Sequence, residues 1–122
     1  MYHHLLMAYF KNESHRGTLA APDFASRKSN PSCGDEISFT GRLANSIITD
    51  LKYEGAGCII SQATASFLCE YAQGKKIPDI LALSINGVLD KLELKLGPNR
   101  LQCVQLSLES LQDALTSYRA HA

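Results

Sequence analysis

The period of the apolar pattern changes once along this chain, at Gly55-Ala-Gly57, and this change determines the expected fold class. Ahead of that point, apolar side chains alternate with polar ones, which is typical of strands that bury one face. Beyond it, apolar residues recur every three or four positions, which indicates amphipathic helices. Strands followed by helices predict an α+β fold, in which helices cover one face of a small antiparallel sheet of about three strands.

Three strands are expected before the change of period. A short edge strand is predicted over 24–28, a second strand over 37–43 and a third over 47–53. Asn45-Ser46 separates the last two strands and predicts a hairpin turn. A short helix is expected to precede the sheet, over residues 2–10.

Four helices are expected after the change of period. The first covers 59–73 and stops at Gly74. Pro78 is suited to the first turn of the second helix, and Asn86 to the cap of the third. The last helix follows a turn at 96–100. Its apolar stripe consists of Val104, Leu108, Leu111, Leu115 and Tyr118.

Composition limits the class of protein. The 122 residues suffice for one domain spanning 1–122, and 45% hydrophobic residues can form a core. Lys+Arg 12 against Asp+Glu 12 leaves no net charge, which argues against nucleic acid and acidic membranes as partners. No apolar run approaches the ~20 residues of a membrane span, and the start lacks the features of a secretory signal. In the cytoplasmic protein that we therefore expect, four cysteines indicate metal or redox chemistry.

Three cysteines and one aspartate suit a metal site. Cys33 and Asp35 belong to Asn-Pro-Ser-Cys-Gly-Asp at 30–35, while Cys58 and Cys103 are each expected at the start of a helix. The positive end of a helix dipole would lower the pKa of either thiol and favour the thiolate. Three thiolates and one carboxylate make a four-ligand set for zinc or an iron–sulfur cluster.

The residues alone leave other interpretations open. No two cysteines have the Cys-x-x-Cys spacing of zinc fingers or ferredoxins, so separate loops would have to bring the ligands together. Any of the cysteines could be a buried core residue, and Asp35 could bond N–H groups of its own turn. Cys69 suits the core best, because it follows Cys58 by about three helical turns and is too distant to share a mononuclear site.

These motifs resemble those of the iron–sulfur cluster assembly scaffolds of the IscU, SufU and NifU N-terminal type. Residues 30–35 match the first motif of that family. Tyr53-Glu-Gly-Ala-Gly-Cys58, with the following 59–66, matches the second. Arg100-Leu-Gln-Cys103 and the long helix after it match the third. The resemblance covers nearly the whole chain.

The resemblance implies that Cys33, Asp35, Cys58 and Cys103 hold zinc or a nascent 2Fe-2S cluster. It implies that a cysteine desulfurase delivers sulfur as a persulfide, with Cys103 as the main acceptor, and that recipient apo-proteins take the cluster. Aspartate is a weak ligand for iron, so its implied role is to keep the cluster labile. A chaperone would bind 96–100, which partly match the family's Leu-Pro-Pro-Val-Lys motif. The chain is thus expected to be a carrier and not an enzyme.

Two alternatives stay open at this point. One is a zinc-dependent sulfur acceptor of the SufU type, in which zinc exchanges a cysteine ligand so that the thiol can take a persulfide. The other is a structural zinc domain without a transfer role. Gln102 stands where one branch has a histidine ligand, and the Cys58 region is more similar to the zinc-dependent branch. The chain lacks the longer insert of that branch before Cys103.

Overall fold

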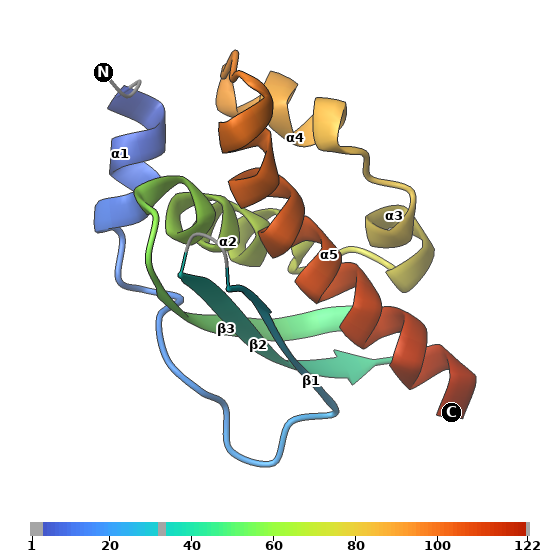
Figure 1. The fold of residues 1–122 in the computed structure, drawn as a ribbon. Coiled ribbons are helices and arrows are strands. Elements are labelled where there is room, and N and C mark those ends of the chain that lie inside the picture. Colours follow the sequence, from blue (N-terminus) through green and yellow to red (C-terminus); the bar gives the residue numbers. More distant parts are fainter. Residues whose placement is uncertain (1–3, 32–33, 122) are drawn as a thin grey trace.

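Three antiparallel strands in the order β1-β2-β3 form the sheet of this protein (Figure 1). The structure, a computed structural model, describes residues 4–31 and 34–121, with side chains up to 119. The elements are α1 (His4–Lys11), β1 (Phe24–Asn30), β2 (Asp35–Ala44), β3 (Ile47–Ala56), α2 (Ile59–Ala72), α3 (Ile77–Leu81), α4 (Ile85–Leu92) and α5 (Pro98–His121).

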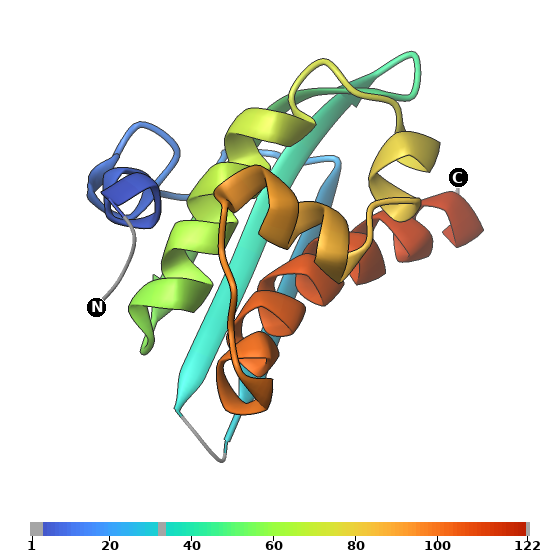
Figure 2. The ribbon, with the colours of Figure 1, turned by 90° about the horizontal axis from the view of Figure 1, so that it is seen from above.

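The two long helices lie side by side on the same face of the sheet, as Figures 1 and 2 show. Helix α2 packs on β3, and α5 packs on β1 and β2. Helix α1 packs on the outer side of α2, while α3 and α4 contact α5. The predicted α+β architecture, with helices on one face of a three-stranded sheet, is therefore confirmed.

The sheet buries alternate residues because successive side chains of a strand point to opposite faces. In β2, Ile37 and Phe39 are buried under the helices, and the residues between them are partly exposed. Asn45 and Ser46 form the two-residue turn between β2 and β3, and both have positive φ, 55° and 65°. Positive φ at both central residues is the geometry that matches the twist of a tight hairpin.

The core is formed where α2 and α5 meet the sheet. Helix α2 is buried nearly all round, which its many small residues allow, because they let neighbouring elements approach closely. The predicted apolar stripe of α5 is buried at four of its five positions, and Tyr118 is partly buried. None of the helices in the described ranges combines the length and apolar character that a membrane crossing needs.

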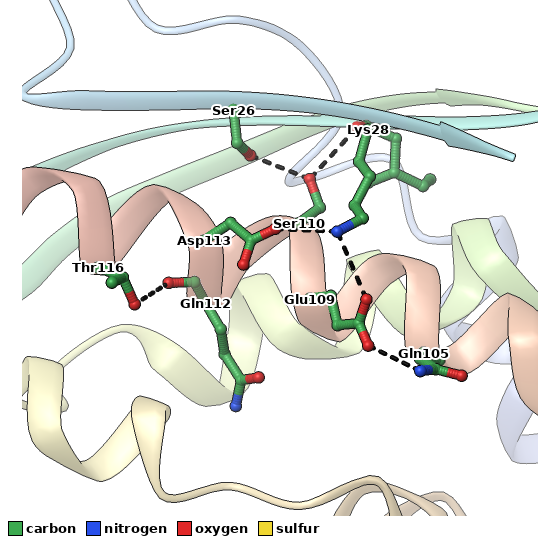
Figure 3. Close-up of polar contacts among 9 residues, drawn as sticks. Ser26, Lys28, Gln105, Glu109, Ser110, Gln112, Asp113 and Thr116 are labelled. Carbon is green, nitrogen blue, oxygen red and sulfur yellow. Dashed lines mark hydrogen bonds and ion pairs between the residues drawn. The ribbon is translucent and has the colours of Figure 1, made fainter.

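Polar contacts join α5 to the edge strand β1 (Figure 3). Lys28 Nζ lies 2.9 Å from Asp113 Oδ2 and 3.4 Å from Glu109 Oε1. Deeper in the interface, the hydroxyls of Ser26 and Ser110 lie 3.0 Å apart. Ion pairs this exposed contribute about 0–1 kcal/mol each, so these contacts set the position of α5 more than they stabilise the fold. They hold the middle of α5 beside β1.

Several element boundaries differ from the prediction. Strands β1 and β3 continue to Asn30 and Ala56, beyond the predicted ends at 28 and 53. Strand β2 already begins at Asp35, because the pairing with β1 extends to Asn30 opposite Asp35. Helix α4 is capped by Ser84, whose Oγ accepts a hydrogen bond from the Gly87 N–H at 3.0 Å, and Asn86 lies inside the helix. Serine and asparagine are comparable caps, so the choice between them depends on where the chain turns.

Helix α5 begins at Pro98, within the segment 96–100 that was predicted to be a turn. A Gly-Pro pair is typical of turns, but proline is also favoured at the first position of a helix, where its missing N–H costs nothing. As a result, Cys103 is the sixth residue of α5 and not its first.

Candidate metal centre

Donor atoms of Asp35, Cys58 and Cys103 lie within 4.8 Å of one another, and they form the metal-ligand cluster found among the described residues. Asp35 is the first residue of β2, Cys58 precedes α2, and Cys103 lies in the second turn of α5. The fold thus brings together three residues from separate parts of the sequence, at the end of the sheet where β2 begins and β3 ends.

The two carboxylate oxygens of Asp35 have different surroundings. Oδ1 accepts a hydrogen bond from the Cys58 backbone N–H at 2.7 Å. Oδ2 is buried and has no hydrogen-bond partner in the part of the chain that the structure describes. A buried carboxylate oxygen without a partner is costly, and a bound cation would satisfy it. Oδ2 is therefore the oxygen that is free to bind a metal.

Cys58 is the N-cap residue of α2. Its Sγ accepts a hydrogen bond from the Ile60 N–H at 3.3 Å, and its side chain is half-buried. The first backbone N–H groups of a helix have no partner within the helix, and the sulfur accepts from one of them. The predicted position of Cys58 at a helix start is thus confirmed.

Gly57 makes room for the Asp35 carboxylate. Its φ is +100°, in the region that favours glycine, and a β-carbon there would lie only 2.4 Å from Asp35 Oδ1. Any other residue would therefore have to displace either the carboxylate or the loop. The glycine directly before Cys58 is therefore required by this close approach.

The pKa of the Cys103 thiol is raised, mainly because the side chain is buried and also because Cys58 and Asp35 lie beside it. The prediction that a helix start lowers this pKa is therefore wrong. The field of a helix terminus falls off within the first turn, and Cys103 lies beyond it. In the absence of metal this sulfur carries its proton at neutral pH.

Two of the three residues of the cluster are buried. Asp35 is 2% exposed and Cys103 is 7% exposed. Cys69 is fully buried in the core and is not among the three residues of the cluster. Cys33, predicted as a further ligand, lies outside the described residues, so its role stays a prediction.

Sequence reasoning missed two residues that lie behind the loop carrying Cys58. Gln62 donates through Nε2 to the Gly57 carbonyl at 3.1 Å, and Arg16 donates through Nη1 to Gln62 Oε1 at 3.1 Å. Gln62 could have been found, because it follows Cys58 by four residues in a predicted helix and so lies on the same side. Arg16 gave no such signal, since it comes from a loop 46 residues away from Gln62 in sequence.

The donor set suits zinc or iron. Two thiol sulfurs and one carboxylate oxygen are ligands that both metals accept. In a tetrahedral zinc site the ligand atoms would be roughly 3.3–3.8 Å apart, as follows from metal–ligand bonds of about 2.0–2.3 Å. The donor atoms here lie within 4.8 Å, so small side-chain movements would close the site.

Comparison with known proteins agrees with this geometry. Residues 1–122 match the sequence model of the NifU-like N-terminal domain. The iron–sulfur cluster assembly scaffold protein IscU of Thermotoga maritima is 29% identical over 131 residues, which cover 94% of this chain and 92% of that protein. The zinc-dependent sulfurtransferase SufU of Bacillus subtilis is 37% identical over 84 residues, 69% of this chain and 56% of SufU.

A solved structure has the same fold. The crystal structure of FiSufU, a candidate scaffold of the SUF system from Fervidobacterium islandicum AW-1, aligns with a TM-score of 0.83 at 26% identity. The alignment covers 93% of this chain and 96% of that one. With a family match over its whole length and a shared fold, this chain belongs to the family of NifU-like N-terminal domains.

Proposed function

We propose that this protein is a scaffold on which an iron–sulfur cluster is assembled, with Cys33, Asp35, Cys58 and Cys103 as its ligands. The observation that carries the proposal is the convergence of Asp35, Cys58 and Cys103 around an unpartnered carboxylate oxygen. The relatives named IscU support the same function. Cys33 is included because it lies two residues before Asp35 in the family's first motif.

Sulfur would reach the site from a cysteine desulfurase as a persulfide. The Cys103 thiolate attacks the outer sulfur of that persulfide, the S–S bond of the donor breaks, and the donor cysteine leaves as a thiolate. Because burial raises the pKa of Cys103, the thiol must first lose its proton. A metal ion bound by Cys58 and Asp35 would favour that loss, since metal ligation displaces the proton of a thiol.

Partners of the scaffold would approach the end of the molecule that carries the site. Recipient apo-proteins would take the cluster, and the weak hard ligand Asp35 would keep it labile enough to leave. A chaperone would bind at 96–100, where 97–100 are exposed and Pro98–Arg100 open the helix that carries Cys103. Binding there would act directly on the position of Cys103.

A second candidate function is that of a zinc-dependent sulfur acceptor. It is favoured by the similarity to a relative named as a zinc-dependent sulfurtransferase, over a segment that covers 69% of this chain. In this function zinc holds the site, and one cysteine exchanges off the metal to take a persulfide. The two functions share the same ligands and differ in whether iron and sulfide build a transferable cluster.

One experiment separates these functions. The protein is purified anaerobically, and its metal content is measured. It is then incubated with a cysteine desulfurase and cysteine, first alone and then with ferrous iron and a thiol reductant, which supplies the electrons that convert persulfide sulfur to sulfide. A scaffold develops the visible absorbance of a cluster, which Cys58→Ala and Cys103→Ala abolish and the core variant Cys69→Ala retains. A persulfide on Cys103 without any cluster, in the zinc-loaded protein, supports the sulfur acceptor. If the protein binds zinc but forms neither a cluster nor a persulfide on Cys103, both functions are contradicted. The remaining interpretation is then a structural zinc domain.

A further inference from the structure

We propose that Arg16 and Gln62 are positioning residues, which orient the Asp35 carboxylate through the Gly57–Cys58 peptide group. The inference rests on the proposed function in one respect: Asp35 is taken to be a metal ligand. The underlying observation is a continuous chain of hydrogen bonds that runs from a guanidinium group to that carboxylate.

The chain of hydrogen bonds has three links. Arg16 Nη1 donates to Gln62 Oε1 at 3.1 Å. Gln62 Nε2 donates to the Gly57 carbonyl at 3.1 Å. The Cys58 N–H then donates to Asp35 Oδ1 at 2.7 Å. The Gly57 carbonyl and the Cys58 N–H belong to one peptide group, so this group is held at both ends.

We call this chain of hydrogen bonds from Arg16 to Asp35 the relay. Its direction is fixed by which atoms can donate a hydrogen bond and which can only accept one. A guanidinium can only donate, so the oxygen of the Gln62 amide must face Arg16. A carbonyl can only accept, so the nitrogen of the same amide must face Gly57. The two requirements agree, and they leave Gln62 a single orientation. Every N–H in the relay thus points toward the Asp35 end.

Arg16 is itself held in place. Its guanidinium lies over the ring of Tyr53, 5.1 Å from the centroid, and its backbone pairs with Tyr53 at the outer edge of β3. Gln62 is 9% exposed, so its hydrogen bonds are shielded from water. Arg16 Nε is buried and has no hydrogen-bond partner among the described residues. The Arg16 side chain as a whole is 28% exposed, and its Nε lies 3.8 Å from Glu13 Oε1. Glu13 thus holds one side of the guanidinium while Nη1 donates to Gln62.

The relay determines which of the two Asp35 carboxylate oxygens accepts a hydrogen bond and which remains without one. Hydrogen bonds that lie in series polarise one another, and a cation at one end of the series strengthens the bond to the anion at the other. Oδ1 is therefore tied to the Cys58 N–H, while Oδ2 stays available. The relay thereby orients Asp35 as a ligand through one oxygen, and it sets the direction in which the Cys58 side chain leaves the loop.

The test uses the Gln62→Met variant of the full chain with two readouts. In the metal-free protein, the Cys58 amide proton should move upfield in a ¹H–¹⁵N spectrum, because its hydrogen bond to Asp35 is weakened. Zinc affinity, measured by competition with a chromophoric chelator, should fall about 10- to 100-fold, as is usual when a group behind a metal ligand is removed.

Three further variants make the test specific. Gln62→Glu still accepts from Arg16 but cannot donate to Gly57, so it should bind zinc no better than Gln62→Met. Arg16→Lys should retain more affinity than Arg16→Met, because lysine can still donate to Gln62. The control is Gln112→Met, since the Gln112 side chain also donates to backbone carbonyls, those of Ile80 and Leu83, but does so away from the site. It should leave the Cys58 amide proton and the zinc affinity unchanged.

The possible results separate this inference from the proposed function. An unmoved Cys58 amide proton in Gln62→Met overturns the relay, as does an unchanged zinc affinity when the wild type binds zinc. Equal losses in Gln112→Met also overturn it, because the effect is then general. If the wild type binds no zinc but the amide proton moves, the relay stands and the metal function fails. If Gln62→Met does not fold, Arg16→Met decides by the same two readouts.

Discussion

Gly57 and Asp35 approach each other so closely that a β-carbon at position 57 would lie 2.4 Å from Asp35 Oδ1. Gly74 offers a matched comparison, because its φ is also positive, +84°, and no atom of the described chain lies within 4 Å of a β-carbon there. Gly74→Ala should cost only the backbone strain, about 1–2 kcal/mol in urea unfolding. Gly57→Ala should cost more and should also lose zinc affinity, because the clash displaces Asp35. Equal stability losses with zinc binding retained would contradict this account.

We expect Asp35→Ala to lengthen the lifetime of a reconstituted cluster. The variant removes the weakest and hardest of the proposed ligands and the polar route by which an attacking thiol would enter. Cluster absorbance should therefore decay more slowly than in the wild type, and transfer to an apo-ferredoxin should slow. Asp113→Ala is the control, because Asp113 lies on the exposed side of α5 against Lys28. A variant cluster that decays faster, with transfer no slower, would show that Asp35 does not confer lability.

Zinc or ferrous iron should stabilise the fold without being needed for it. At a hundredfold excess of zinc over its dissociation constant, binding to the native state alone adds about 2.7 kcal/mol to the free energy of unfolding. The metal-free protein should still unfold cooperatively, because the core between α2, α5 and the sheet consists mainly of apolar side chains, such as Phe39, Leu68 and Leu111, that pack without metal. Thermal unfolding with zinc and with a chelator measures both points. If the thermal unfolding midpoint of the wild type is the same with zinc and with a chelator, as it should be in Cys103→Ala, the protein has no zinc site at this cluster.

The free energy of unfolding should fall at alkaline pH partly because of Cys69. Burial raises the pKa of this thiol above the ordinary value of 9.0. Above about pH 9 the unfolded chain releases the proton that the folded chain retains, so stability decreases by up to about 1.4 kcal/mol per pH unit. Below that pH the contribution is constant.

Urea unfolding between about pH 8 and pH 10.5 measures this effect. Cys69→Ala should show a shallower fall than the wild type. Ile48→Val, a core variant without a titrating group, should lower stability at every pH by a similar amount and leave the slope unchanged. Parallel curves for the wild type and Cys69→Ala would exclude a contribution from Cys69.

Local patterns in the sequence were sufficient for most of the fold. The alternation in β2, the turn at Asn45-Ser46 and the stripe of α5 each depend on neighbours within a few residues, and each was confirmed. The start of α5 was misplaced because a Gly-Pro pair fits both a turn and a helix start, and only the packing of α5 on the sheet decides between them. That error placed Cys103 at a helix terminus and gave its pKa the wrong direction.

The site could be predicted only in part, for a physical reason. Motif similarity indicated Asp35, Cys58 and Cys103, but their proximity is a property of three elements that meet in space. The contribution of Arg16 could not be foreseen, since it depends on a loop that pairs with the edge of β3. Spacing in the sequence cannot reveal the whole relay, because two of its three links join segments far apart in the chain.

Of the two Asp35 oxygens, Oδ1 accepts a hydrogen bond and Oδ2 has no partner among the described residues. This difference has a consequence for the reversible binding of a metal. A side chain that is anchored through Oδ1 has already lost most of its rotational freedom before any ligand arrives. Breaking a metal bond at Oδ2 would therefore release little conformational entropy. The carboxylate would already be oriented to form the bond again. If a metal binds at Oδ2 as proposed, the carboxylate can release it and bind it again without losing its hydrogen bond to the Cys58 N–H, so the site would keep its shape between the two events.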